Sequence, residues 1–198
     1  MMHKWEKAYK ENKFSIKTDK PSRVVGMVVD HLKDGSRVLD LGCGAGRNAV
    51  YLAGRGFHVD AVDVADLDFL SDVPQEIMER INFRKCHVED AFSGEKYGLI
   101  IAARLFQYIS KDELENLFAS AWQSLEDDGI FVSSYTVEGG IFDRDDIEVS
   151  KYAYPIEVIE KSLHDHGFKN IAISSGSSES KYVPYSSAIK TFDIIACR

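Results

Sequence analysis

Residues 37–65 read RVLDLGCGAGRNAVYLAGRGFHVDAVDVA, and this stretch decides the fold. Three glycines, Gly42, Gly44 and Gly46, stand at every second position between a short apolar run and a run with helical character. Glycine weakens both strands and helices, so this spacing indicates a turn whose backbone comes close to another group. Asp63 ends the next apolar run about 20 residues further on, where an acidic side chain can bind both hydroxyls of a ribose. The stretch therefore predicts a strand, a glycine turn, a helix and a second strand around a nucleotide-like ligand.

The composition is that of a single globular domain. The chain has 198 residues, of which 44% are hydrophobic and 28% charged, and its formal net charge is -8. No apolar run approaches the ~20 residues of a membrane span, and residues 1–20 are too charged for a secretory signal. The three cysteines, Cys43, Cys86 and Cys197, fit neither a disulfide framework nor a metal site. We therefore expect a cytoplasmic protein with reduced thiols, no metal and no membrane partner.

Apolar runs alternate with helical patterns along most of the chain, which predicts an α/β fold. Ser110 and Glu113 form a capping box in front of the most regular helical pattern. We expect a single doubly wound, Rossmann-like sheet of about seven mostly parallel strands, with its ligand at the carboxyl ends of the strands. The expected strands are 37–41, 58–64, 81–88, 97–104, 129–137, 168–175 and 189–198, and the expected helical regions are 21–32, 47–54, 66–80, 111–125 and 155–166.

The residue sequence of the glycine turn distinguishes it from two other nucleotide-binding turns. A phosphate-binding loop needs Gly-Lys followed by Ser or Thr, but Arg47 and Asn48 follow here. A dinucleotide fingerprint, G-x-G-x-x-G counted from Gly42, would need glycine where Arg47 stands, which argues against a nicotinamide-dependent oxidoreductase. The spacing found is G-x-G-x-G, preceded by Asp40.

The sequence VLDLGCGAG resembles the first motif of the class I S-adenosylmethionine-dependent methyltransferases. The resemblance extends over residues 21–198 and implies S-adenosylmethionine as the cofactor and an antiparallel last strand inserted between strands five and six. The length and the short amino-terminal segment, residues 1–20, resemble the tellurite-resistance and thiol-methylating branch, in which that segment would act as a lid. The chain departs from this branch at Gly98, where an acidic residue is usual.

The resemblance implies a role for each residue of the cofactor site. The turn backbone would hold the methionine half, Asp40 would place negative charge near the sulfonium, and Asp63 would bind the ribose. Val64 would touch the adenine ring. Asp40 could instead cap the turn, Asp63 could be a loop acid, and Asp90 could be a helix cap. The implied cofactor residues are Asp40, Gly42, Cys43, Gly44, Asp63, Val64, Asp90 and Ala91, where Asp90 and the Ala91 backbone would bind the adenine and Cys43 serves as a small packing residue.

The sequence indicates the residues that would bind the methyl acceptor less clearly. Methyltransferases that act on the amino groups of bases resemble one another in an Asn/Asp-Pro-Pro-aromatic tetrad after strand four, and residues 102–108, AARLFQY, lack it. Arg104 could grip an anionic substrate or the cofactor carboxylate, or be a solvated loop residue. Tyr135 could line a pocket or lie in the core. The histidines offer no well-placed general base.

We expect direct methyl transfer to a small-molecule nucleophile by a monomer or homodimer. The lid would contribute Trp5, Tyr9 and Phe14, together with the loops 138–153 and 176–187. Two alternatives remain open: a non-catalytic module that binds S-adenosylmethionine or S-adenosylhomocysteine, and an RNA methyltransferase with a basic arm at residues 4–23. The negative net charge argues against a nucleic-acid partner.

Overall fold

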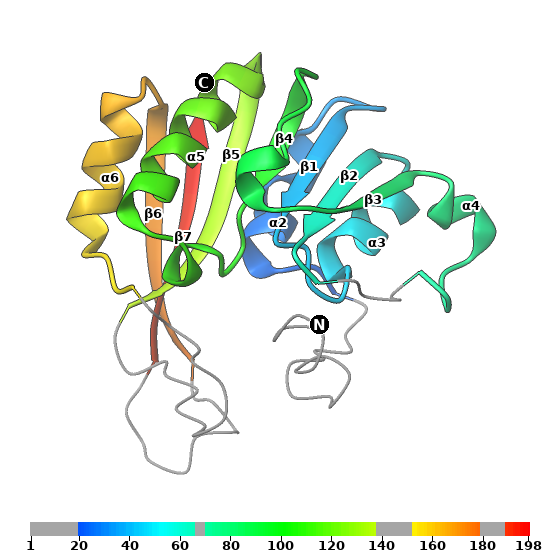
Figure 1. Ribbon diagram of the computed structural model, residues 1–198, viewed down its shortest axis with the longest axis horizontal. Helices are drawn as coiled ribbons and strands as arrows, with labels where there is room; N and C mark the ends of the chain where they lie inside the picture. The colour runs from blue at the N-terminus through cyan, green and yellow to red at the C-terminus, as the bar shows by residue number, and fades with distance from the viewer. Residues whose placement is uncertain (1–19, 66–69, 138–151, 179–188) are drawn as a thin grey trace.

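The computed structural model describes residues 20–65, 70–137, 152–178 and 189–198. Seven strands form one sheet in the order β3-β2-β1-β4-β5-β7-β6 (Figure 1). The expected lid residues Trp5, Tyr9 and Phe14 lie outside the described residues. The strands are β1 Arg37–Leu41, β2 His58–Asp63, β3 Ile81–Lys85, β4 Tyr97–Ile101, β5 Leu125–Val137, β6 Lys169–Ser178 and β7 Ile189–Cys197.

Strand pairing confirms the predicted topology. β1 pairs in parallel with β2 and β4, β3 with β2, and β5 with β4. β7 is antiparallel to both of its neighbours and lies between β5 and β6, as the resemblance implied. The order of the strands reverses between β1 and β4, so their carboxyl ends form the crevice in which such sheets bind ligands. These carboxyl ends lie at the lower edge of the sheet in Figure 1.

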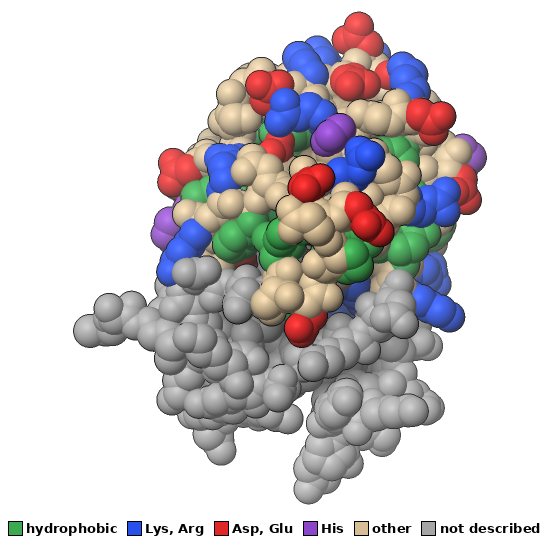
Figure 2. Space-filling model, turned by 90° about the vertical axis from the view of Figure 1, so that its right-hand side faces the viewer, with side chains coloured by type: hydrophobic (Ala, Val, Ile, Leu, Met, Phe, Trp, Pro, Cys, Tyr) green, Lys and Arg blue, Asp and Glu red, His purple; other side chains and the backbone are tan. Residues whose placement is uncertain are grey.

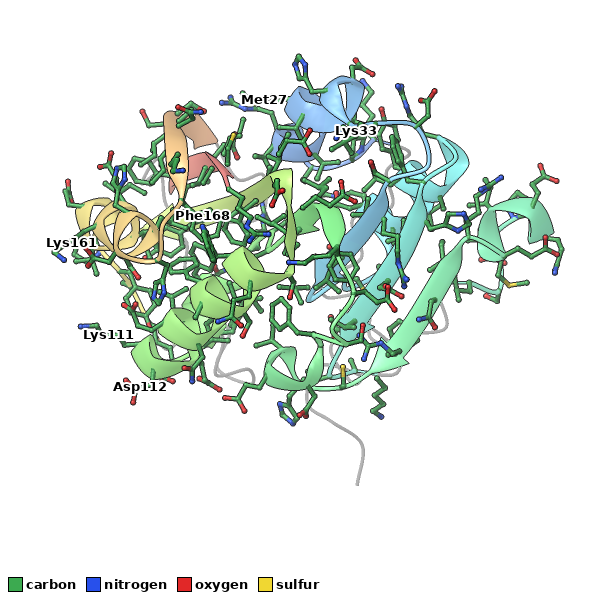
Figure 3. All side chains as sticks on the ribbon, turned by 90° about the horizontal axis from the view of Figure 1, so that it is seen from above. Met27, Lys33, Lys111, Asp112, Lys161 and Phe168 are labelled. Carbon is green, nitrogen blue, oxygen red and sulfur yellow. The ribbon has the colours of Figure 1, made fainter. Side chains whose placement is uncertain are left out.

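Helices cover both faces of the sheet. Seen along the strands, α5 and α6 lie on one face and α2 on the other (Figure 3). A core of 22 buried residues on the α5 and α6 side contains Phe118 and Phe131, whose rings meet edge to face at 5.8 Å. The other core packs α2 and α3 against β1 and β2. The helices are α2 Arg23–Val28, α3 Arg47–Gly54, α4 Gln75–Met78, α5 Lys111–Ser124 and α6 Ile156–Asp165, with 3₁₀ turns η1 Val29–His31, η2 Val88–Asp90 and η3 Phe106–Tyr108.

The capping box at the start of α5 is confirmed. The Glu113 N–H donates to Ser110 Oγ at 3.3 Å, and the Ser110 N–H donates to Glu113 Oε2 at 2.6 Å. Leu114, Leu117 and Phe118 are buried against the sheet, as the helical spacing predicted. A long, well-capped helix is therefore readable from local sequence alone.

Element ends differ from the prediction where the backbone turns sharply. The fourth strand stops at Ile101 rather than at residue 104, and Arg104 has a φ of 58°, in the left-handed region that strands do not use. The third strand stops at Lys85, before the 3₁₀ turn η2. The helical region expected at 66–80 is reduced, within the described part, to α4. The fifth strand, expected from residue 129, begins at Leu125.

Across the residues that the structure describes, no helix is long and apolar enough to span a membrane. On the face shown in Figure 2, the described Lys and Arg side chains are interspersed with Asp and Glu.

Candidate functional site

The glycine turn lies at the carboxyl end of β1 and has an unusual backbone. Gly42, Gly44 and Gly46 have φ angles of 66°, 55° and 71°, a region that other residues rarely occupy. The turn is held by the Cys43 N–H, which donates to Val62 O at 3.0 Å, and by the Gly46 N–H, which donates to Cys43 O at 3.0 Å. The conformation matches the turn expected from the sequence. Cys43 itself is buried, and its burial raises the thiol pKa, which fits a packing residue rather than a nucleophile.

Asp63 ends β2 and faces the glycine turn, 19 residues away in the sequence. Its Oδ2 accepts the Gly44 N–H at 2.9 Å, and its Oδ1 accepts the Ala65 N–H at 2.9 Å. This anchoring fixes both carboxylate oxygens beside the glycine turn, and a carboxylate oxygen can accept more than one hydrogen bond. The structure thus brings the acid and the turn together.

Asp40 is the buried acid of the site. It is 1% exposed, and its pKa is raised to about 7 because burial disfavours the charge and Asp63 adds a like charge nearby. Arg47, the side chain of Asn48 and the backbone N–H of Ala49 act in the opposite direction. Within the described part of the chain, its Oδ2 has no hydrogen-bond partner. A buried carboxylate oxygen without a partner is suited to a cationic ligand group.

The residues expected around the adenine lie at the carboxyl ends of β2 and β3. The Cys86 N–H donates to Asp63 O at 3.0 Å and ties these two ends together. Asp90 is exposed in η2, and Val64 is half-buried beside Asp63. Ala91 is fully buried, and its N–H, expected as a donor to the adenine, donates to Val88 O at 3.2 Å.

Tyr135 lies in the aromatic core rather than at an exposed pocket wall. It is 1% exposed, and its hydroxyl donates to Tyr154 O at 2.6 Å while accepting the Tyr154 N–H. The Tyr154 hydroxyl in turn donates to Ile109 O at 2.8 Å. The sequence left open whether Tyr135 lines a pocket or lies in the core, and this geometry favours the core.

Arg104 follows β4 on the other side of the crevice from the glycine turn. Its N–H donates to Ser134 O at 2.7 Å, and its side chain is exposed. The next residue, Leu105, lies against the glycine turn: its Cδ1 is 3.3 Å from the position that a Cβ on Gly42 would occupy. Arg104 is therefore held at the switch point between β1 and β4.

Sequence reasoning missed two residues of this site, Arg47 and Asn48, and one buried polar residue of η3, Gln107. It used Arg47 and Asn48 only to exclude other motifs, but both begin α3 beside Asp40. Asn48 Oδ1 also accepts the Ser22 N–H at 2.8 Å, which brings the start of the described chain to the glycine turn. Gln107 was not considered. The sequence could have indicated Arg47 and Asn48, because the first turn of a helix that follows a glycine loop borders the ligand. Gln107 had no such signal.

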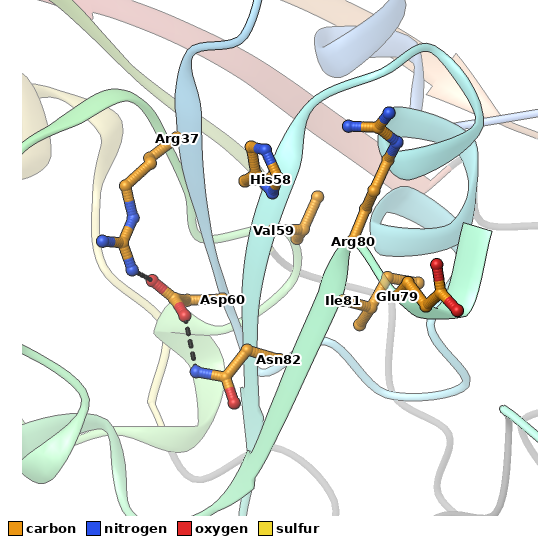
Figure 4. Close-up of a pocket in the computed structure, with 8 residues that line it drawn as sticks. All are labelled: Arg37, His58, Val59, Asp60, Glu79, Arg80, Ile81 and Asn82. Carbon is orange, nitrogen blue, oxygen red and sulfur yellow. Dashed lines mark hydrogen bonds and ion pairs between the residues drawn. The ribbon is translucent and has the colours of Figure 1, made fainter. Parts of the chain in front are cut away.

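A separate pocket of about 490 Å³ lies at the amino ends of the strands (Figure 4). Its polar wall includes Asp60, which accepts hydrogen bonds from Arg37 at 2.8 Å, Asn82 at 2.8 Å and the Tyr97 hydroxyl at 3.0 Å. This pocket is at the opposite edge from the switch point, and its buried acid is already satisfied by the protein. We therefore place the candidate site at the glycine turn and not here.

Similar proteins were found by sequence. A probable S-adenosyl-L-methionine-dependent methyltransferase TehB of Haemophilus influenzae is 30% identical over 112 residues, which are 54% of this chain and 39% of that protein. A ubiquinone biosynthesis O-methyltransferase of Rickettsia canadensis is 24% identical over 115 residues, which are 56% of this chain and 48% of that protein. The matched parts thus span less than half the length of these relatives.

Solved structures share the fold. The 1,6-didemethyltoxoflavin-N1-methyltransferase of Burkholderia thailandensis, solved with S-adenosylhomocysteine, has a TM-score of 0.76 and 20% identity, covering 97% of this chain and 84% of that one. A TehB-like S-adenosylmethionine-dependent methyltransferase of Corynebacterium glutamicum has a TM-score of 0.64 and 16% identity, covering 96% and 95%. At these identities the likeness establishes the architecture alone.

A family model described as "Tellurite resistance protein TehB" matches residues 2–134, well over half of the chain. This match confirms the resemblance that the glycine motif carried. The chain therefore belongs to the TehB family, within the class I S-adenosylmethionine-dependent methyltransferases.

Proposed function

We propose that the chain binds S-adenosylmethionine at the carboxyl ends of β1 and β2 and transfers its methyl group to a small molecule. The observation that carries this proposal is the buried oxygen of Asp40, which has no partner among the described residues and lies beside a left-handed glycine turn. A cationic methionine portion supplies what that carboxylate lacks, because it brings positive charge and N–H donors into a buried site.

Different residues of the chain bind different parts of the cofactor. The backbone at Gly42 and Gly44 has no side chains to keep a ligand away, so the methionine portion can lie directly on the turn. Asp63, already fixed by two backbone N–H groups, is held at the end of β2 for the ribose hydroxyls. Val64 would contact the adenine ring, and Asp90 would bind its amino group.

S-adenosylmethionine supplies a methyl carbon that its sulfonium already activates. The protein's contribution is then alignment of the acceptor and exclusion of water, rather than a strong base. Relatives named for ubiquinone biosynthesis and for the N1 position of a toxoflavin precursor act on small molecules, which supports the same class of acceptor here.

We also propose that residues 1–20 form a lid over the site. Support comes from the Ser22 N–H, which donates to Asn48 Oδ1 at the start of α3 and so brings the chain into the described fold next to the glycine turn. Removal of residues 1–18 is expected to leave cofactor binding in place and to lower methyl transfer. Full transfer by the shortened chain would contradict this role.

Calorimetry tests the proposal directly. The full chain is titrated with S-adenosylmethionine, S-adenosylhomocysteine and NADH, and we expect binding of the first two and none of the third. Production of S-adenosylhomocysteine in the presence of a small-molecule panel then separates an enzyme from a binding module. Binding of NADH alone would overturn the proposal, and turnover only with RNA would replace the small-molecule acceptor.

A further inference from the structure

The segment that follows β4 lies over the cofactor turn without being part of it. Arg104 takes a left-handed backbone, with a φ of 58°, and its N–H is held by Ser134 O at 2.7 Å. Leu105 contacts Gly42. A non-glycine residue in this conformation is strained, and such strain is typical of positions where a side chain must be aimed. The turn therefore holds the Arg104 backbone at the switch point between β1 and β4, and the exposed side chain starts from there.

Arg104 and Arg47 bring two positive charges to the switch point. Within the described part of the chain, no carboxylate forms an ion pair with either guanidinium. Arg47 is half-buried, and its pKa is lowered first by burial and then by the positive charge of Arg104, so the two groups are close enough to repel. The negative charge of Asp40 acts in the opposite direction on the Arg47 pKa. An anion beside Arg104 would therefore be stabilised.

Gln107 supplies a second polar group from the same segment. It is 7% exposed, and its Oε1 is among the few buried side-chain oxygens for which the described residues offer no hydrogen bond. Its amide pairs with the Tyr108 hydroxyl, and its backbone oxygen accepts the Tyr152 N–H at 3.3 Å. Buried polar atoms are nearly always satisfied, so an acceptor without a partner in the segment that follows β4 indicates a donor on a ligand.

We propose that Arg104 and Gln107 form the acceptor subsite, and that the methyl acceptor is a small anion that also carries an O–H or N–H group. Arg104 binds the anionic group, and Gln107 Oε1 accepts the hydrogen of the O–H or N–H. Arg47, which lies beside Asp40, binds the carboxylate of the cofactor instead. The inference rests on the proposed function, because it places the acceptor relative to a cofactor bound at the glycine turn.

The test measures binding of defined probes to the full chain saturated with S-adenosylhomocysteine. The probes are small aliphatic and aromatic carboxylic acids, their carboxamides, and the hydroxylated form of each. We expect the acids to bind more tightly than the amides, and the hydroxyl to add affinity. Arg104→Gln should remove the preference for the acid, a loss of about tenfold, and Gln107→Leu should remove the gain from the hydroxyl, about fivefold.

Matched variants separate this inference from the cofactor site. Arg104→Lys should retain part of the preference for acids, whereas Arg80→Gln, an exposed arginine at the amino edge, should change nothing. Gln107→Met replaces Gln107→Leu if the latter does not fold. Neither Arg104→Gln nor Gln107→Leu should alter the affinity for S-adenosylhomocysteine.

Three results would overturn the inference while leaving the proposed function intact. They are equal binding of acids and amides by the wild-type chain, no binding of any acid while S-adenosylhomocysteine binds, and a loss of S-adenosylhomocysteine affinity in Arg104→Gln as large as the loss of acid affinity. The last would assign Arg104 to the cofactor carboxylate. Failure of the wild-type chain to bind S-adenosylhomocysteine would refute the proposed function instead.

Discussion

Asp40 and Asp60 are buried aspartates on neighbouring parallel strands, and the protein treats them in opposite ways. Asp60 is 4% exposed near the amino end of β2, and its carboxylate is satisfied by Arg37, Asn82 and Tyr97. Burial alone would raise its pKa, but these hydrogen bonds outweigh burial and lower it. Asp40 is 1% exposed near the carboxyl end of β1, keeps one oxygen without a described partner, and has a pKa raised to about 7.

The difference separates structural burial from functional burial. An acid that the fold satisfies contributes to stability, and one that the fold leaves incomplete costs stability until a ligand completes it. The two edges of the same sheet therefore have different tasks. Substitutions at the carboxyl edge should change ligand affinity, and substitutions at the amino edge should change the free energy of unfolding.

The largest effect is expected from Gly44→Val at the carboxyl edge. Its φ of 55° is a region that a β-branched residue avoids, and a side chain there would occupy space next to the bound methionine portion. We expect calorimetry to show at least a ~100-fold loss of affinity for S-adenosylmethionine, or about 2.7 kcal/mol.

Gly35→Val is the matched control at the amino edge. Gly35 has a φ of 74°, and a Cβ there would meet nothing within 4 Å, so valine adds backbone strain without blocking a ligand. Its melting temperature should fall while cofactor affinity is retained. Equal loss of affinity in both variants would mean that strain, not close approach of the ligand, explains Gly44.

A smaller loss of affinity is expected from Asp63→Ala. This change removes the acceptor for the ribose hydroxyls and also the anchor of the Gly44 N–H. We expect the affinity for S-adenosylmethionine to weaken by about 1–3 kcal/mol, the usual cost of losing hydrogen bonds to a charged group. Asp34→Ala removes an exposed acid at the amino edge and should leave the affinity unchanged. Wild-type affinity in a folded Asp63→Ala chain would refute the ribose role.

Asp60→Asn should affect stability instead of binding. The amide keeps the shape but loses the charge that Arg37, Asn82 and Tyr97 surround, so chemical denaturation should show a loss of about 2 kcal/mol in unfolding free energy. In the wild-type chain this contribution is present above the ordinary aspartate pKa of 3.8 and is lost as the pH falls through the lower folded-state value. A change in cofactor affinity at constant folding would break the contrast between the edges.

The sequence could predict the sheet and the cofactor half because their signals are local. The glycines, Asp40 and Asp63 sit at fixed positions relative to strand ends, and strand ends follow from apolar runs bounded by turns. Strand alternation and the capping box at Ser110 gave the architecture for the same reason. The match to the family model then agreed with the prediction made from the glycine motif.

The remaining residues depend on contacts that spacing does not reveal. Whether a buried acid is satisfied depends on partners from other strands, as Tyr97 is for Asp60 across 37 residues of sequence. The sequence made Tyr135 a candidate for a pocket wall with the core as the alternative, and only the hydrogen bond from its hydroxyl to Tyr154 O favours the core. Gln107 gave no signal, because an unpartnered oxygen is visible only after the chain has folded around it.

The smallest effect on cofactor affinity is the pH dependence that Asp40 confers. Its pKa is about 7 in the folded chain against an ordinary value of 3.8, so the folded state binds the proton more tightly than the unfolded state. Stability without ligand should therefore fall as the pH rises from about 4 to about 7, and then level off. Cofactor affinity should move the other way. A cationic ligand prefers ionised Asp40, and the ionised fraction rises through the same range.

Between pH 6.0 and 7.5 we expect the affinity for S-adenosylmethionine to rise about eightfold, following the ionised fraction of a group with a pKa near 7. The comparison ends at pH 7.5 because an α-amino group on the ligand, with an ordinary pKa of about 7.7–8.0, loses most of its protons above that pH. Asp40→Asn should bind more weakly at pH 7.5, show no such rise, and be more stable than the wild-type chain without ligand at that pH. Asp60→Asn should keep the rise, since Asp60 is ionised throughout this range. A rise of equal size in Asp40→Asn would place the titrating group on the ligand or elsewhere in the protein, and would remove Asp40 as the acid that the cofactor completes.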